Sequence, residues 1–269
     1  MLELNLFQLL LFLVSGAFVG LLAGMLGVGG GLIVVPILLY MLPITGVSPE
    51  LVPHMAIATS LATIVVNATA SVRVHHRHGS VIWWAFKALT PGVILGSILG
   101  SFLARLIPSA HLKTIFGIFT LLLSLQMIFK FKPAPNRKQP GKKTLFAAGS
   151  VVGCFSTLVG IGGGSILVPY LTYWDTQMTK AIGTSSAVGL PLSIAGTLGF
   201  ILAGWNIPFK PSLSLGYVYL PAFFGIVMVS SFTAPIGVKI SQKISGKSLS
   251  RLFAGFLIAI ALDILLPLI

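Results

Sequence analysis

Charged residues and cysteine are scarce in this chain. Of its 269 residues, 8% are charged, only four are acidic and one is a cysteine, Cys154. A soluble domain carries about 25% charged residues, so this composition excludes an ordinary soluble fold. A single cysteine excludes an intrachain disulfide and a two-thiol relay, and we expect Cys154 to be a small buried apolar residue.

Sequence signals for catalysis and metal binding are also missing. There is no His-Glu-x-x-His, no Gly-x-Ser-x-Gly, no pair of intramembrane aspartates and no Gly-x4-Gly-Lys-Ser/Thr loop. The three histidines of Arg73–His78 cannot all face one ion from a helix, so this run is better explained as a basic helix end. We therefore expect a protein that is not an enzyme and that needs no metal or cofactor.

Long apolar runs are abundant. Hydrophobic residues make up 56% of the chain and the mean hydropathy is +1.03, which indicates a polytopic helical membrane protein. The runs do not alternate between apolar and polar residues as β-barrel strands do. The net charge is +13, but the basic residues lie in short loops between apolar runs. Such residues report orientation in a lipid bilayer, so we expect no nucleic-acid partner.

One glycine-rich stretch occurs twice. Gly27–Pro36 and Gly160–Pro169 both read Gly-x-Gly-Gly-Gly-x-x-x-Val-Pro and lie inside apolar runs. Four glycines in five residues disfavour a helix, because glycine loses the most backbone freedom on ordering. Broken backbone is tolerated in a membrane only where protein or a water-filled cavity surrounds it. Paired breaks of this kind point to the binding site of a transporter.

The apolar runs themselves form an internal repeat. They are Leu4–Leu42, Met55–Val74, Trp83–Leu106 and Leu112–Phe129, then Thr144–Trp174, Ala181–Gly204, Leu215–Val238 and Leu249–Leu268. This pattern predicts a first repeat over 1–129, a basic cytoplasmic linker over 130–143 and a second repeat over 144–269. Two shorter matches accompany it: Ala58-Thr59-Ser60 with Gly183-Thr184-Ser185, and Thr90-Pro91 with Leu220-Pro221.

The positions of the basic residues favour inverted over parallel repeats. If each glycine-broken run is a re-entrant hairpin, 14 of the 17 lysines and arginines fall on one side of the membrane. If each run crosses the membrane, the split is 10 to 7, and the first arrangement fits the positive-inside rule better. The predicted fold class is an all-α polytopic membrane protein with two inverted structural repeats. Each repeat is a glycine-broken re-entrant hairpin plus three transmembrane helices.

The glycine breaks are the predicted substrate site. A helix that starts after Gly31 or Gly164 presents free N–H groups and the positive end of its dipole, which attract an anion. Hydroxyl groups in the following helix can bind the anion or, as is common in membranes, their own helix. Close helix packing is the alternative role of the glycines. The predicted substrate-binding residues are Gly29, Gly30, Gly31, Thr59, Ser60, Gly162, Gly163, Gly164, Ser165, Thr184 and Ser185.

Two charged residues are candidates for coupling or steering. Asp263 lies inside an apolar run, where a carboxyl group is a candidate proton site, but its position near the chain end also lets it reach the interface. Lys180 can attract anions at a cytoplasmic mouth or anchor a helix at the interface. The sequence is compatible with proton coupling and with a homo-oligomer.

The repeated motifs resemble those of the TauE/SafE family of sulfite and organosulfonate exporters. The resemblance is carried by residues 24–31 with Val35-Pro36, 58–61, 159–164 with Val168-Pro169, and 183–186. It implies a multi-pass permease of the plasma membrane, the inner membrane in a bacterium, that exports a small sulfur-containing anion by alternating access around a midplane site. The alternatives are a passive small-anion channel and an importer of a sulfur oxyanion.

Overall fold

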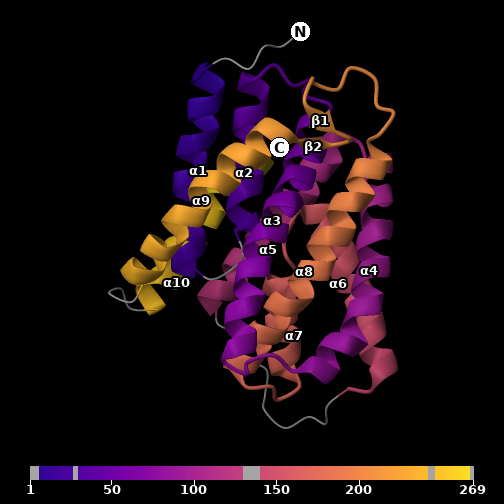
Figure 1. Ribbon diagram of the computed structural model, residues 1–269, viewed down its shortest axis with the longest axis vertical. Coiled ribbons are helices and arrows are strands. Elements are labelled where there is room, and N and C mark those ends of the chain that lie inside the picture. Colours follow the sequence, from indigo (N-terminus) through magenta and orange to yellow (C-terminus); the bar gives the residue numbers. More distant parts are fainter. Residues whose placement is uncertain (1–5, 27–29, 130–139, 242–245, 267–269) are drawn as a thin grey trace.

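The computed structural model describes residues 6–26, 30–129, 140–241 and 246–266. These residues form ten helices and one short β-hairpin (Figure 1). The elements are α1 (Leu6–Leu26), α2 (Gly31–Ile44), α3 (Val52–Arg77), α4 (Trp83–Leu106), α5 (Ser109–Phe129), α6 (Lys142–Val159), α7 (Gly164–Tyr173), α8 (Met178–Ala203), β1 (Ser214–Leu215), β2 (Val218–Tyr219), α9 (Leu220–Ser241) and α10 (Gly246–Leu265).

Seven of the helices are long and apolar enough to cross a membrane. They are α1, α3, α4, α5, α8, α9 and α10. The prediction of an all-helical, multi-pass membrane protein is therefore confirmed. One apolar run differs from its prediction: Leu215–Val238 begins inside the β-hairpin, and the helix α9 starts only at Leu220. The predicted linker lies largely outside the described residues, and α6 begins at Lys142.

Both glycine-rich stretches interrupt a helix, as the sequence predicts. The first break separates α1 from α2, and the second separates α6 from α7. Gly30 and Gly163, which precede α2 and α7, have φ angles of 82° and 73°. Gly160, which follows α6, has a φ of 77°. Residues with side chains rarely adopt such positive φ angles, so glycine is needed where the chain leaves one helix and enters the next.

The two central helices are α3 and α8. The most hydropathic windows of these two helices are 61% and 56% buried, more than in any other candidate span. Their middles contact the glycine breaks. Ile64, halfway along α3, packs against Gly31 and Gly162, and Gly189, halfway along α8, packs against the carbonyl group of Gly162. Both breaks therefore lie at mid-height of the long helices, far from either end.

The outer helices join opposite halves of the chain. Helix α1 packs along α9, and α6 packs along α4. Small residues allow the backbones to approach closely, because a Cβ at Gly20 would lie 2.6 Å from Cα of Ser230 and a Cβ at Gly96 would lie 2.0 Å from the carbonyl oxygen of Ser150. Half-buried Cys154 belongs to the second contact, where its carbonyl oxygen faces Gly100.

One of the shorter sequence matches is wrong. Pro91 lies well inside α4, whereas Pro221 is the second residue of α9. The two prolines therefore do not occupy equivalent positions. A proline in a hydrophobic run is a weak marker of register, because membrane helices tolerate it at the first turn and in the interior alike.

Candidate substrate-binding site

The two glycine breaks touch each other. A Cβ at Gly31 would lie 2.7 Å from the carbonyl oxygen of Gly160 and 3.1 Å from Cα of Ile161. Ser60 of α3 also reaches this junction, and its hydroxyl donates a hydrogen bond of 2.8 Å to the same Gly160 carbonyl. The start of α2 therefore rests directly on the end of α6. Gly29, also predicted to bind substrate, lies outside the described residues.

The first break is closed in this structure. Gly30 and Gly31 are buried, and the next two side chains, Leu32 and Ile33, are 3% and 2% exposed. The N–H groups of Ile33 and Val34 donate to the carbonyl of Gly30 at 2.9 and 3.0 Å, which completes the first turn of α2. Side chains and the second break therefore cover the start of this helix.

The second break is open at the start of α7. Apart from its own helix, no atom of the described residues lies within 4 Å of the place where a Cβ of Gly164 would stand. The N–H groups of Ile166 and Leu167 donate to the carbonyl of Gly163 at 3.1 and 2.8 Å. The N–H groups of Gly164 and Ser165 precede these bonds and have no hydrogen-bond partner among the described residues. This helix start thus presents two free donors and the positive end of a dipole.

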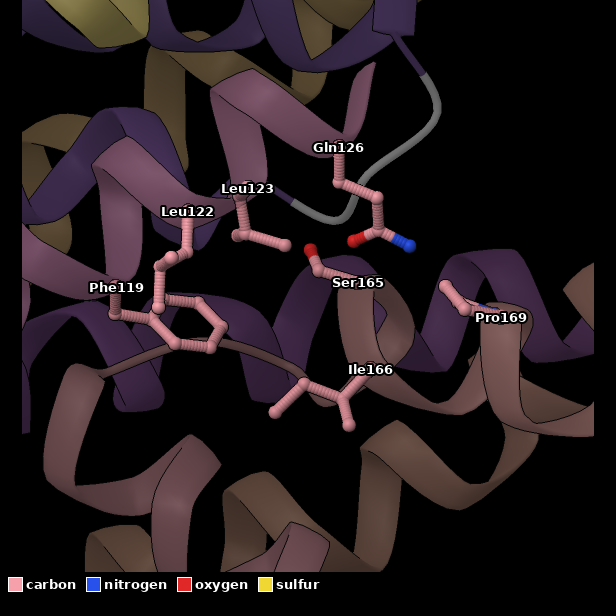
Figure 2. Close-up of a pocket in the computed structure, with 7 residues that line it drawn as sticks. All are labelled: Phe119, Leu122, Leu123, Gln126, Ser165, Ile166 and Pro169. Carbon is pink, nitrogen blue, oxygen red and sulfur yellow. The ribbon is translucent and has the colours of Figure 1, made fainter. Parts of the chain in front are cut away.

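A pocket of about 200 Å³ lies beside this helix start, between α5 and α7 (Figure 2). Its walls are Phe119, Leu122, Leu123, Gln126, Ser165, Ile166 and Pro169. Figure 2 shows the hydroxyl of Ser165 and the amide of Gln126 pointing toward one another across the pocket. One polar group comes from each half of the chain, and the remaining walls are apolar.

Sequence reasoning missed Gln126. The available signal was its position in α5, where it is a polar side chain among apolar residues close to the helix end. The same signal singled out Asp263. A glutamine amide supplies two N–H donors and one carbonyl acceptor, so Gln126 can donate to an oxyanion without adding charge to the pocket.

The two threonines predicted to bind substrate form hydrogen bonds with the protein backbone instead. Thr59 accepts a hydrogen bond of 3.0 Å from the N–H of Tyr219, just before α9. Thr184 accepts one of 2.9 Å from the N–H of Ile82, just before α4. Both threonines are fully buried. Each therefore holds the start of a helix in the other half of the chain, away from the open helix start at Gly164.

Ser185 differs from its counterpart Ser60. Its side chain is 1% exposed, and its hydroxyl has no hydrogen-bond partner in the part of the chain that the structure describes. The residue of the first break that corresponds to Gly160 is Gly27, which lies outside that part. The remaining predicted glycines, Gly162 and Gly163, line the second break between α6 and α7.

The charged candidates lie away from the pocket. Lys180 is exposed in the first turn of α8. Asp263 is exposed near the end of α10 and accepts a hydrogen bond from the hydroxyl of Tyr40 in α2. The basic run ends α3, as predicted, and the ring of His76 contacts Trp83 at a centroid distance of 5.3 Å. No group of three metal-binding side chains occurs among the described residues.

Known proteins resemble this chain over nearly its whole length. Residues 12–264 match the family described as Sulfite exporter TauE/SafE. A probable membrane transporter protein of Haemophilus influenzae is 39% identical over 264 residues, which cover 96% of this chain and 98% of that protein. A probable membrane transporter protein of Methanocaldococcus jannaschii is 30% identical, with 95% of each chain covered. YunE of Bacillus subtilis, also a probable membrane transporter protein, is 26% identical over 94% of this chain and 95% of its own. No solved structure matches.

Proposed function

This chain belongs to the TauE/SafE family of membrane transporters, and we propose that it exports a small sulfur-containing anion such as sulfite or an organosulfonate. Members of this family are transporters and not enzymes. The family's description supports a sulfur oxyanion as the substrate. The plasma membrane, the inner membrane in a bacterium, is the proposed location.

The proposal rests on the open start of α7. An anion in the adjacent pocket can accept hydrogen bonds from the N–H groups of Gly164 and Ser165, from the Ser165 hydroxyl and from the Gln126 amide. Among the described residues no charged side chain lines the pocket. The attraction for an anion therefore comes from backbone donors and the helix dipole, an arrangement that binds oxyanions in many proteins.

We infer inverted repeats from three features of the packing. The pair α1–α2 lies toward the end where the N-terminus is, whereas α7 lies toward the opposite end (Figure 1). Helix α1 packs along α9, and α6, the counterpart of α1, packs along α4, the counterpart of α9. The hydrogen bonds from Tyr219 to Thr59 and from Ile82 to Thr184 are likewise reciprocal. In this arrangement α1–α2 and α6–α7 are the re-entrant pairs, entering from opposite sides, although α1 is by length and composition also a candidate span.

The distribution of charge supports an assignment of sides. The end of the molecule where α3 ends and α8 begins carries most of the described basic residues, among them Arg77, Lys87, Lys142 and Lys180. By the positive-inside rule this end is cytoplasmic. Gln126 lies near the same end of α5, so we infer that the pocket beside the mid-height break opens toward the side from which an exporter takes up its substrate. Lys180 is placed to attract anions there.

Gly164→Leu is the sharpest test of the site. Because no described residue outside its own helix lies beside Gly164, a leucine can enter this space without displacing any of them, and it would occupy the place of the anion. We expect sulfite efflux from proteoliposomes to fall by about tenfold or more, the loss that follows when a charged ligand gives up one or two hydrogen bonds. Gly255→Leu is the matched control, since Gly255 is also in a membrane helix with empty space beside it.

Parental efflux in a correctly folded Gly164→Leu protein would refute the site. A flux that grows with substrate concentration without saturating, in the parent protein, would favour the passive channel instead. Uptake driven against the sulfite gradient, with no corresponding export, would favour the importer.

A further inference from the structure

Asp263 is an exposed carboxyl group two residues from the end of α10, a helix long and apolar enough to cross a membrane. Among the described residues no other acidic side chain lies within a candidate span, because Glu50 and Asp175 are in loops. Charged groups at such positions are costly and usually serve a transport function. The hydrogen-bond partner of Asp263 is the hydroxyl of Tyr40, which belongs to α2 in the other half of the chain.

Tyr40 connects Asp263 to the substrate site. Helix α2 carries Tyr40 near its end and Gly31 at its start, and Gly31 rests on Gly160 and Ile161 of the second break. The helix is continuous from Gly31 to Ile44, although Pro36 removes one backbone hydrogen bond within it, so it can pass a movement of Tyr40 on to Gly31. The contact between Tyr40 and Asp263 therefore affects whether the first break stays closed against the second.

The inverted repeats place Asp263 and Gln126 at equivalent positions. The buried residues of α5 and α10 have the same spacing along each helix. They are Phe116, Gly117, Thr120 and Ser124 in α5, and Phe253, Ala254, Leu257 and Ala261 in α10. This register aligns Gln126 with Asp263. The same position thus lines the anion pocket in one half and contacts a glycine-broken helix in the other.

No cation is paired with Asp263 among the described residues. Helices α1 and α2 carry no charged side chain in their described parts, and Tyr40 is the titratable residue that α2 presents. On α5, which packs against α10, the titratable residues are His111 and Lys113, both in its first turns. Arg251 lies at the far end of α10. The carboxylate can therefore gain a proton without breaking an ion pair.

We propose that Asp263 binds the coupling proton and that Tyr40 transmits its protonation to α2. This inference rests on the proposed transport function. When the carboxylate is charged, Tyr40 donates to it and α2 stays against the second break. When a proton from the outer solution binds the carboxylate, its negative charge is lost and the Tyr40 contact weakens. Helix α2 is then free to leave Gly160 and uncover the first break, while Tyr40 keeps its own proton.

The test is sulfite efflux from proteoliposomes at fixed inner pH and varied outer pH. Fixing the inner pH keeps the protonation of the loaded sulfite constant. The parent's efflux should rise several-fold as outer pH falls from about 7.5 to about 6, because by linkage a higher outer proton concentration favours the protonated state that uncovers the first break. Asp263→Asn and Tyr40→Phe should lose this dependence but retain sulfite–sulfite exchange within about twofold of the parent.

Tyr173→Phe is the matched control, because Tyr173 is the corresponding tyrosine of α7, and it should keep the parent's pH dependence. An Asp263→Asn protein with the parental pH dependence would overturn the proton site. A Tyr40→Phe protein with the parental pH dependence would overturn the role of α2. This variant removes only a hydroxyl group, so it still tests the proposal if the Asp263→Asn protein does not fold. A parent protein that neither effluxes nor exchanges sulfite would instead refute the proposed function.

Discussion

The hydroxyl oxygens of Thr59 and Thr184 make equivalent hydrogen bonds in the two halves of the chain. Each hydroxyl oxygen accepts from the backbone N–H that precedes a helix of the opposite half. The sequence could show that this Thr-Ser pair is repeated, but it could not show the partners, which lie 160 and 102 positions away. Ser60 is closer to the prediction, since it does reach a glycine break, although it bonds the backbone there.

Replacing either threonine by valine should destabilise the fold. Valine has nearly the same shape but no hydroxyl, so the buried N–H of Tyr219 or the part-buried N–H of Ile82 would lose its partner at a cost of about 1–3 kcal/mol. We expect Thr59→Val and Thr184→Val to lower the melting temperature in detergent. Thr114→Val should leave it nearly unchanged, because Thr114 is half-buried and its solvent-exposed hydrogen bond to the Ala110 carbonyl lies within its own helix. Equal melting temperatures for all three variants would contradict this role.

Among the elements, the helix breaks could be predicted and the hairpin could not. Glycine density is a local signal. It located the ends of α1 and α6 and the starts of α2 and α7 to within a few residues. The hairpin β1–β2 pairs only Ser214 with Tyr219 and Leu215 with Val218, and it turns at Gly216 with a φ of 58°. Strands of two residues show no periodicity, so the apolar composition of this segment indicated a helix instead.

The close contact of α4 with α6 gives a prediction at the element scale. A valine at Gly96 would place its Cβ against the Ser150 carbonyl, and backbone atoms cannot move aside as a side chain would. Such overpacking costs about 1–3 kcal/mol or more. Gly96→Val should therefore reduce the yield of folded protein and its melting temperature, whereas Gly255→Val should not. A normal yield and stability for Gly96→Val would show that these helices separate easily.

The whole molecule is interlocked across its two halves. Composition alone predicts the membrane class, and the positions of the basic residues predict the orientation. Both properties are obtained by counting residues along the chain and need no knowledge of its contacts. The pairing of α1 with α9 and of α6 with α4 depends on contacts between distant segments, and no local pattern reports it. This pairing has a mechanical consequence: a movement of α1 with α9, or of α6 with α4, carries helices from both halves of the chain.

The location of a bound anion tests the account most directly. Selenite is a close analogue of sulfite, and its selenium atom can be located by anomalous scattering in crystals of the protein. We predict a selenium peak in the pocket between α5 and α7, with selenite oxygens about 3 Å from the N–H groups of Gly164 and Ser165. A selenite ion bound at a distance from both glycine breaks, with this pocket empty, would contradict the account.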